Sequence, residues 1–162
     1  MNSLPAAEAE AALFRCCGSS RWVSSMLARR PFATREALLA AADEIWAGLG
    51  RADFLEAFSH HPAIGADIAE LRKRFAATSA WSSEEQAGAA EADEATLAAL
   101  RAGNLSYAAR FGYIFIVCAS GKSAREMLAL LEQRLQNAPQ IELGVAAAEQ
   151  AKITKLRLEK LA

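Results

Sequence analysis

Apolar residues recur along the chain at intervals of three and four positions, the spacing that places them on one face of an α-helix. The segment after Thr34 is an example, because Leu38, Ile45 and Trp46 fall on one stripe. Thr34 belongs to the residue types that cap helix N-termini, and glycine commonly follows a helix C-terminus. The pattern predicts a helix that begins after Thr34 and ends near Gly48 and Gly50.

The same spacing, with proline, glycine and serine at the breaks, predicts an all-α fold of roughly eight helices. The other predicted helices are one opened by Pro5 that ends near Cys16, one around Trp22 and Met26, a short one with Phe54 and Phe58, one after Gly65, one from Ser82 to about Arg101, and those that begin at Asn104, Ser123 and Pro139.

Residues 113–117 are aromatic and β-branched, as strand residues often are. The sequence has no second run of this kind to pair with them, so we expect a buried end of a helix. No repeat, linker or low-complexity tract interrupts the chain. We therefore expect a single compact domain over residues 1–162.

Composition limits the kinds of binding partner and the cellular compartment that we expect. Eighteen basic residues against nineteen acidic ones predict neither nucleic acid nor a membrane surface as partner, but a small molecule or a second copy of the chain. The three cysteines, Cys16, Cys17 and Cys118, are odd in number and lack C-x-x-C spacing, as in reduced cytoplasmic proteins. The longest apolar run, residues 111–119, is far shorter than the ~20 residues of a membrane span.

The two histidines, His60 and His61, stand side by side directly before Pro62. Proline disfavours helical geometry in the residue before it, so His61 is expected in a connection between helices. Histidine titrates near neutral pH unaided, and connections often carry chemistry. These residues alone favour a simpler hypothesis, in which the imidazole caps a backbone group at a helix end.

Residues 82–86 read Ser-Ser-Glu-Glu-Gln, which contains the S-x-x-E pattern of a capping box. In that motif Ser82 accepts a hydrogen bond from the backbone and Glu85 accepts one in return, which explains both residues structurally. A helix N-terminus also presents unpaired N–H groups that can bind a carboxylate or a polar ring. Taken alone, these residues favour the capping interpretation over the binding one.

Other motifs predict no metal and no organic cofactor. Adjacent histidines usually point in different directions, which disfavours a metal site. Residues 48–50 (Gly-Leu-Gly) lack the third glycine of a dinucleotide motif, and residues 121–123 (Gly-Lys-Ser) lack the first glycine of a P-loop. The chain has no G-x-S-x-G elbow and no cysteine in a recognisable nucleophile setting.

Several segments together resemble the 2-oxo-4-hydroxy-4-carboxy-5-ureidoimidazoline (OHCU) decarboxylases of urate breakdown, over nearly the whole chain. They are residues 17–23 (Cys-Gly-Ser-Ser-Arg-Trp-Val), 30–32 (Arg-Pro-Phe), 61–65 (His-Pro-Ala-Ile-Gly), 82–88 (Ser-x-x-Glu-Gln-Ala-Gly), 107–119 (Tyr-x-x-Arg-Phe-Gly-Tyr-Ile-Phe-Ile-Val-Cys-Ala) and 152–158 (Lys-Ile-Thr-x-x-Arg-Leu). Their order and spacing are specific, whereas each alone is weak. The resemblance implies an all-helical domain that is usually a homodimer.

The resemblance also implies which residues form the site, and it reverses the preference for a simple cap at His61 and Glu85. The implied catalytic residues are His61 and Glu85. The implied substrate contacts are Pro62, Ser82, Ser83, Glu84, Glu85, Gln86, Phe115, Ile116, Val117, Cys118 and Ala119. Relatives often carry a small residue or a cysteine where this chain has His60, so we assign His60 no role.

The implied reaction converts OHCU to (S)-allantoin without a cofactor, because the neighbouring ring imine can accept the electron pair that carbon dioxide leaves behind. The protein would supply positioning and proton transfer. We expect His61 to act as the acid/base, and Glu85 to hydrogen-bond the ureido or ring N–H groups or to steer the proton of His61. The alternatives are a non-catalytic helical module that binds a ureide or a protein, and a lyase or hydrolase for a related ureido compound.

Overall fold

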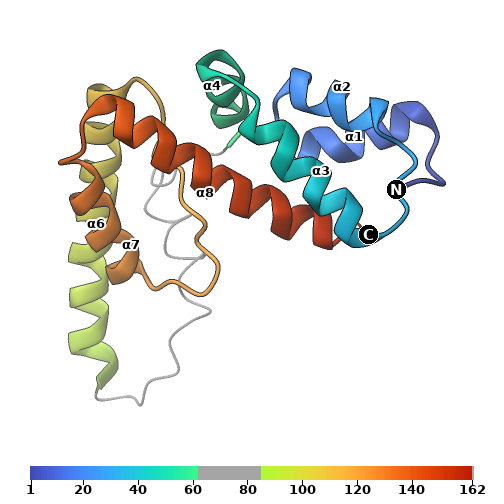
Figure 1. Cartoon of the computed structure of the whole chain (residues 1–162). Helices are drawn as coiled ribbons and strands as arrows, with labels where there is room; N and C mark the ends of the chain where they lie inside the picture. The colour runs from blue at the N-terminus through green and yellow to red at the C-terminus, as the bar shows by residue number, and fades with distance from the viewer. Residues whose placement is uncertain (62–84, 162) are drawn as a thin grey trace. The chain divides into compact units, whose positions relative to one another are not determined.

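The computed structural model describes residues 1–61 and 85–161, and the side chains of all of these except residues 85–93. Seven helices and no strand occur in these ranges, which confirms the all-α prediction (Figure 1). They are α1 (Ala6–Cys16), α2 (Ser20–Ala28), α3 (Arg35–Ala47), α4 (Arg51–Ser59), α6 (Glu85–Phe111), α7 (Ala124–Arg134) and α8 (Pro139–Glu159). The helix predicted after Gly65 lies outside the described residues.

Tertiary contacts divide the chain into two units, each described here by itself. Unit 1 comprises Met1–His61, Ile116–Cys118 and Leu143–Ala162, and unit 2 comprises Pro62–Phe115 and Ala119–Glu142. The single domain expected over residues 1–162 stays a prediction.

In unit 1, two tryptophans join the helices through their indole N–H groups. Trp22 of α2 is fully buried, and its Nε1 donates to the carbonyl oxygen of Ala42 in α3 at 3.1 Å. Trp46 of α3 donates from Nε1 to the carbonyl oxygen of Ala147 in α8 at 2.9 Å. Each indole thus buries a large apolar surface while its one donor is satisfied. Figure 1 shows α3 running beside α8.

Local capping explains where several helices begin. The Oγ1 atom of Thr34 accepts a hydrogen bond from the backbone N–H of Ala37 at 3.1 Å, which confirms the predicted start of α3. Ser123 caps α7 in the same way and forms a capping box with Glu126. The predicted starts at Ser123 and Pro139 are therefore confirmed.

The predicted break between Arg101 and Asn104 is wrong, because α6 runs without interruption from Glu85 to Phe111. Gly103 lies where α6 packs closely against α7 in unit 2. A Cβ atom at this position would lie 2.6 Å from the Cδ2 atom of Leu131. The glycine serves the close approach of two helices, and this packing outweighs its low helix propensity.

The prediction that residues 113–117 form the end of a helix is also wrong. Helix α6 ends at Phe111, Gly112 adopts a φ of 79°, and residues 114–119 form no regular secondary structure. A positive φ after the last helical residue redirects the chain, and glycine adopts it without strain. Residues 115–118 are nevertheless buried, as expected from their apolar side chains.

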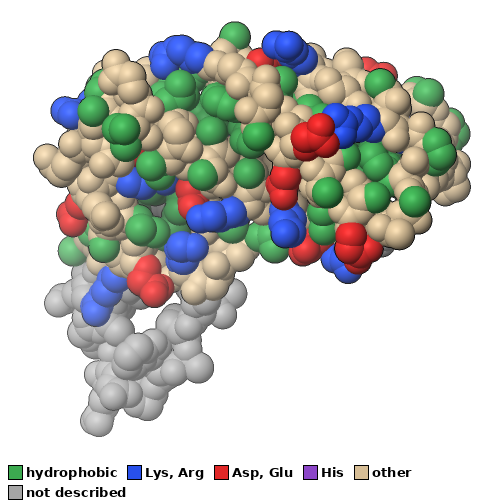
Figure 2. Space-filling model, in the orientation of Figure 1, with side chains coloured by type: hydrophobic (Ala, Val, Ile, Leu, Met, Phe, Trp, Pro, Cys, Tyr) green, Lys and Arg blue, Asp and Glu red, His purple; other side chains and the backbone are tan. Residues whose placement is uncertain are grey.

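Among the residues that the structure describes, no helix is long and apolar enough to cross a membrane. Figure 2 shows Lys and Arg side chains interspersed with Asp and Glu over the visible face. This face therefore carries no broad field of a single sign, in keeping with a formal net charge of -1.

Candidate active site

His61 lies directly beyond the C-terminal end of α4, as the following proline predicted. The backbone N–H groups of His60 and His61 donate to the carbonyl oxygens of Ala57 and Phe58, at 3.3 Å and 3.1 Å, and complete the last turn of α4. The Nε2 atom of His61 is buried and forms no hydrogen bond with a described residue. Within the described chain, this atom therefore caps no backbone group.

The environment of His61 favours a neutral imidazole. Burial lowers the pKa of His61 below its usual value of 6.5, and the positive charge of Arg157 lowers it further. The amide of Gln150 opposes both effects, since it favours the protonated ring. At neutral pH the side chain is thus a base with a polar neighbour that can stabilise its protonated form.

Gln150 of α8 is fully buried beside this imidazole. Its Nε2 donates to the Oγ1 atom of Thr154 at 3.0 Å, which orients the amide. Its Oε1 atom, like Nε2 of His61, lacks a well-formed hydrogen bond to any residue in the described ranges. Gln150 thus acts on His61 as a nearby polar group, and two polar atoms that normally demand partners are available at this point of unit 1.

The apolar segment of residues 115–119 is anchored separately within each unit. In unit 2 the Phe115 side chain is buried, with the ring of Tyr107 at 5.2 Å between centroids and the Arg134 guanidinium carbon 4.5 Å from its centroid. In unit 1 the backbone N–H of Cys118 donates to Oε2 of Glu149 at 2.7 Å. Ile116 and Val117 are also buried, whereas Ala119 is partly exposed.

The remaining predicted site residues cannot be placed around these. Pro62, Ser82, Ser83 and Glu84 lie outside the described residues. Glu85 and Gln86 open α6, and the structure describes their backbone alone. The capping box of Ser82 and Glu85, and the contacts of these residues with a substrate, stay predictions.

Comparison with known protein families decides which family these features belong to. The family model described as OHCU decarboxylase matches residues 2–159. The chain belongs to the OHCU decarboxylase family. The family expected from the sequence segments is therefore confirmed.

Similar proteins agree with this family. The chain is 41% identical over 147 residues to the uric acid degradation bifunctional protein TTL of Arabidopsis thaliana, a match that covers 90% of this chain and 45% of that protein. It is 34% identical over 134 residues to the 2-oxo-4-hydroxy-4-carboxy-5-ureidoimidazoline decarboxylase of Amia calva, covering 82% and 74% of the two chains. A crystal structure of OHCU decarboxylase in the presence of (S)-allantoin matches with a TM-score of 0.73 and 38% identity, covering 91% of this chain and 94% of that one.

Arg157 is a candidate functional residue that the sequence analysis missed. Its Nη1 donates to the carbonyl oxygens of Arg15 and Cys16, at 3.1 Å and 3.3 Å, which holds the guanidinium at the C-terminal end of α1. From there its charge acts on His61. Arg157 belongs to residues 152–158, one of the segments that resemble the OHCU decarboxylase family, and this was the available signal.

The three cysteines are buried and none forms a disulfide, and burial raises the pKa of the Cys16 and Cys17 thiols to about 11. A thiol with so high a pKa is a poor nucleophile at neutral pH. Among the described residues, no three His, Cys, Asp or Glu side chains gather as metal ligands would. In the part of the chain described, His61 is thus the group best suited to proton transfer.

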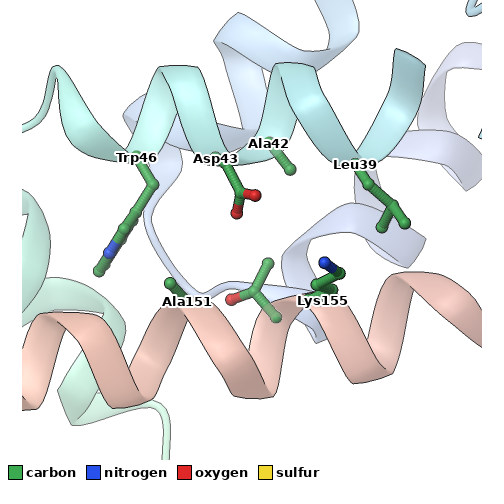
Figure 3. Close-up of a pocket in the computed structure, with 7 residues that line it drawn as sticks. Leu39, Ala42, Asp43, Trp46, Ala151 and Lys155 are labelled. Atoms are coloured by element: carbon green, nitrogen blue, oxygen red, sulfur yellow. The ribbon is translucent and has the colours of Figure 1, made fainter. Parts of the chain in front are cut away.

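A small cavity between α3 and α8 offers no room for a substrate. Figure 3 shows Asp43 and Trp46 of α3 facing Ala151 and Lys155 of α8 across it. Its volume is about 10 Å³, which is near the least that one water molecule requires. We therefore assign it no functional role.

Proposed function

We propose that this protein is a cofactor-independent carboxy-lyase that converts OHCU to (S)-allantoin in urate breakdown. The observation that carries the proposal is the neutral, half-buried His61 beyond the end of α4, in a chain that matches the OHCU decarboxylase family over residues 2–159. A base of this kind suits a reaction whose protein-assisted step is the movement of one proton.

The structure of OHCU determines which bonds must break and form. The carbon–carbon bond to the carboxylate breaks, carbon dioxide leaves, and the electron pair enters the neighbouring ring imine. The imine nitrogen takes up one proton from solvent, which gives a neutral enol-like intermediate. Allantoin then forms when the hydroxyl proton leaves oxygen and a proton is added to the adjacent ring carbon. Because this tautomerisation neither gains nor loses a proton overall, a single acid/base can complete it.

His61 is the group we assign to that transfer. Its neutral imidazole takes the hydroxyl proton, and the resulting imidazolium returns it to one face of the ring, so that (S)-allantoin forms rather than the racemate. The oxygen of Gln150, which lacks a well-formed bond within the described chain, stabilises the imidazolium while it exists. A half-buried site strengthens such contacts by excluding water.

We also propose how the substrate is held. Glu85 binds the ureido or ring N–H groups, and Pro62 and the side chains and N–H groups at residues 82–86 hold the ring. The Phe115 side chain is enclosed by Tyr107 and Arg134, so we propose that this residue contacts substrate through its backbone. Ile116 to Ala119 would exclude water.

The first experiment follows freshly generated OHCU by circular dichroism with catalytic amounts of the wild-type protein. We expect rapid loss of the substrate signal and formation of (S)-allantoin alone. Decay at the spontaneous rate to racemic product, with folded protein, would show that the function is wrong and favour the non-catalytic binding module.

Two variants then test the residues. His61→Gln should lower the rate by about 100- to 10,000-fold, the usual contribution of general acid/base catalysis, whereas Ser59→Ala, an exposed neighbour, should not. Full rate and handedness in folded His61→Gln would remove His61 from the mechanism. A Glu85→Gln variant that unfolds more easily but keeps its rate would return Glu85 to a capping role.

We further propose a homodimer located in the cytoplasm, in which residues 1–162 fold as one domain. These proposals rest on the resemblance to the family and on the single family match across both units. Light scattering coupled to gel filtration, and a single cooperative unfolding transition, are the expected results.

A further inference from the structure

A second cavity lies in unit 1, apart from the residues assigned to catalysis. Its volume is about 570 Å³, and it is formed by the C-terminal half of α1, His60 and the C-terminal end of α8. Neither His61 nor any described residue of the segment 115–119 lines it. A volume of this size is typical of small-molecule sites.

The charged side chains that line this cavity share one sign. Arg15, Arg157 and Lys160 line it together with His60, and no Asp or Glu among the described residues does. Arg15 and Lys160 are exposed, so an anion can reach them. A concave surface with cations alone attracts small anions more strongly than the mixed charges of the face shown in Figure 2.

Arg157 is held in place before any ligand arrives. Both of its hydrogen bonds to backbone carbonyl oxygens use Nη1. No residue in the described ranges accepts a hydrogen bond from its Nε or Nη2. A cation that is fixed in this way and keeps free donors loses little conformational entropy when it binds an anion.

The other wall of the cavity is largely apolar. The rings of Phe14 and His60 meet edge to face, with centroids 4.8 Å apart and an angle of 75° between planes. His60 packs against Gly18, where a Cβ atom would lie 2.7 Å from the imidazole. Leu161 adds a further apolar side chain. These contacts hold the Phe14 ring in place, and a ligand ring can pack against it.

We propose that this cavity binds a flat organic anion, with its ring against Phe14 and Leu161 and its phosphate or carboxylate among Arg15, Arg157 and Lys160. This site adjoins that of the proposed decarboxylation, because Arg157 lines the cavity and also acts on His61. Since the charge of Arg157 also acts on His61, a bound anion would partly offset that charge and change the electrostatic environment of His61.

Phenyl phosphate is a suitable probe, with phenol and inorganic phosphate as probes that each lack one half of it. We expect saturable binding of phenyl phosphate in calorimetry, at least tenfold tighter than either control. Because the chain has two histidines, NMR can follow each ring, and the His60 resonances should shift at the same concentrations. Equal binding of phenol would overturn the anion site, and equal binding of phosphate would overturn recognition of a ring.

Variants locate the site. Arg15→Ala with Lys160→Ala should weaken phenyl phosphate about tenfold or more, whereas Arg101→Ala with Arg125→Ala, which removes the same charge from exposed positions of unit 2, should not. Equal weakening by both pairs would indicate a general field and overturn the proposal. Loss of binding in His61→Gln with no effect of Arg15→Ala and Lys160→Ala would place the anion in the catalytic site and also overturn it.

Should the first pair fail to fold, the wild-type NMR titration decides, because shifts confined to His61 would contradict the proposal. Binding is measured without turnover, so a protein that does not decarboxylate OHCU but binds phenyl phosphate at His60 would contradict the proposed function alone.

Discussion

A buried carboxylate in unit 2 and a buried amide in unit 1 differ in how fully their hydrogen bonds are satisfied. Glu142 has 0% exposed surface. Its Oε1 accepts from the Tyr107 hydroxyl and from the Nε of Arg134 at 2.8 Å, and its Oε2 accepts from the Nδ2 of Asn137 at 2.7 Å. Burial and the carboxylate raise the pKa of Tyr107 above its usual range, so its hydroxyl stays a donor.

Gln150 also has 0% exposed surface, yet it has one clear partner, Thr154. Its oxygen and the Nε2 of His61 lack well-formed bonds within the described chain. An unsatisfied buried polar group costs about 1–3 kcal/mol. The contrast teaches that the Glu142 cluster is completed by folding, whereas the groups near His61 are available for a ligand to complete.

The largest expected effect on stability tests whether the hydrogen bonds of Glu142 hold the fold together. Glu142→Leu leaves the Arg134 guanidinium buried without its carboxylate, and such a loss costs about 3–5 kcal/mol of unfolding free energy. Urea denaturation measures it. The double variant Arg134→Met with Glu142→Leu should recover much of the loss, because a buried pair replaced by apolar residues is often neutral. A single-variant loss below about 1 kcal/mol would show that the cluster is not structural.

The next effect probes how tightly unit 2 is packed beside that cluster. Gly103→Ala places a methyl group 2.6 Å from the side chain of the buried Leu131, and overpacking of this kind costs about 1–3 kcal/mol. Gly144→Ala in α8 is the matched control, since nothing lies within 4 Å of its Cβ position, and it should gain about 0.5–1 kcal/mol. Thermal unfolding compares the two. Equal effects would mean that α6 and α7 separate easily.

A smaller effect on stability tests whether Gln150 is available for a ligand rather than for the fold. Gln150→Leu removes one hydrogen bond and one poorly satisfied oxygen, so the unfolding free energy should change by no more than about 1 kcal/mol. The decarboxylation rate should fall, because the imidazolium of His61 loses a stabilising neighbour. A stability loss above about 3 kcal/mol with an unchanged rate would make Gln150 a structural residue like Glu142.

The smallest expected effect is a shift in the pKa of His61, which NMR can follow. Its midpoint should lie below 6.5, because burial and Arg157 disfavour the charged ring. Arg157→Leu should raise this midpoint, whereas Arg157→Lys, which keeps the charge, should hardly move it. A midpoint at or above 6.5 in the wild type would contradict the environment described for His61.

The same lowered pKa makes stability depend on pH. As pH falls below 6.5, the unfolded chain binds a proton at His61 before the folded protein does, so stability that is present above pH 6.5 is lost toward the folded-state pKa. His61→Gln should remove this part of the pH dependence. Melting temperatures measured on both proteins across this range would show it.

The helices were largely predictable because their signals are local. Three- and four-residue spacing shows which face of a helix is apolar, and the residues at Thr34, Ser123 and Pro139 mark where helices begin. His61 was predictable for the same reason, since the effect of Pro62 on its backbone spans one peptide bond. Identification of the candidate catalytic residues rested instead on resemblance to the family.

Two local expectations failed where packing decided the outcome. Gly103 was expected at a helix break, but the close approach of Leu131 makes a glycine useful inside α6. Residues 113–117 were expected to be helical, but Gly112 turns the chain and burial of Phe115 to Cys118 occurs without regular structure. In each case the local structure depends on a packing neighbour or a turn that residue types alone do not reveal.

The sequence by itself determined the all-α class, most helix boundaries, the position of His61 beyond a helix and the family. Only the tertiary structure showed that Arg157 and Gln150 of α8 neighbour His61, that Tyr107, Arg134 and Asn137 satisfy Glu142, and that cations of α1 and α8 share a cavity. The physical reason is range: helix propensity and capping act within a few residues, whereas burial, charge coupling and hydrogen-bond satisfaction depend on which distant segments pack together.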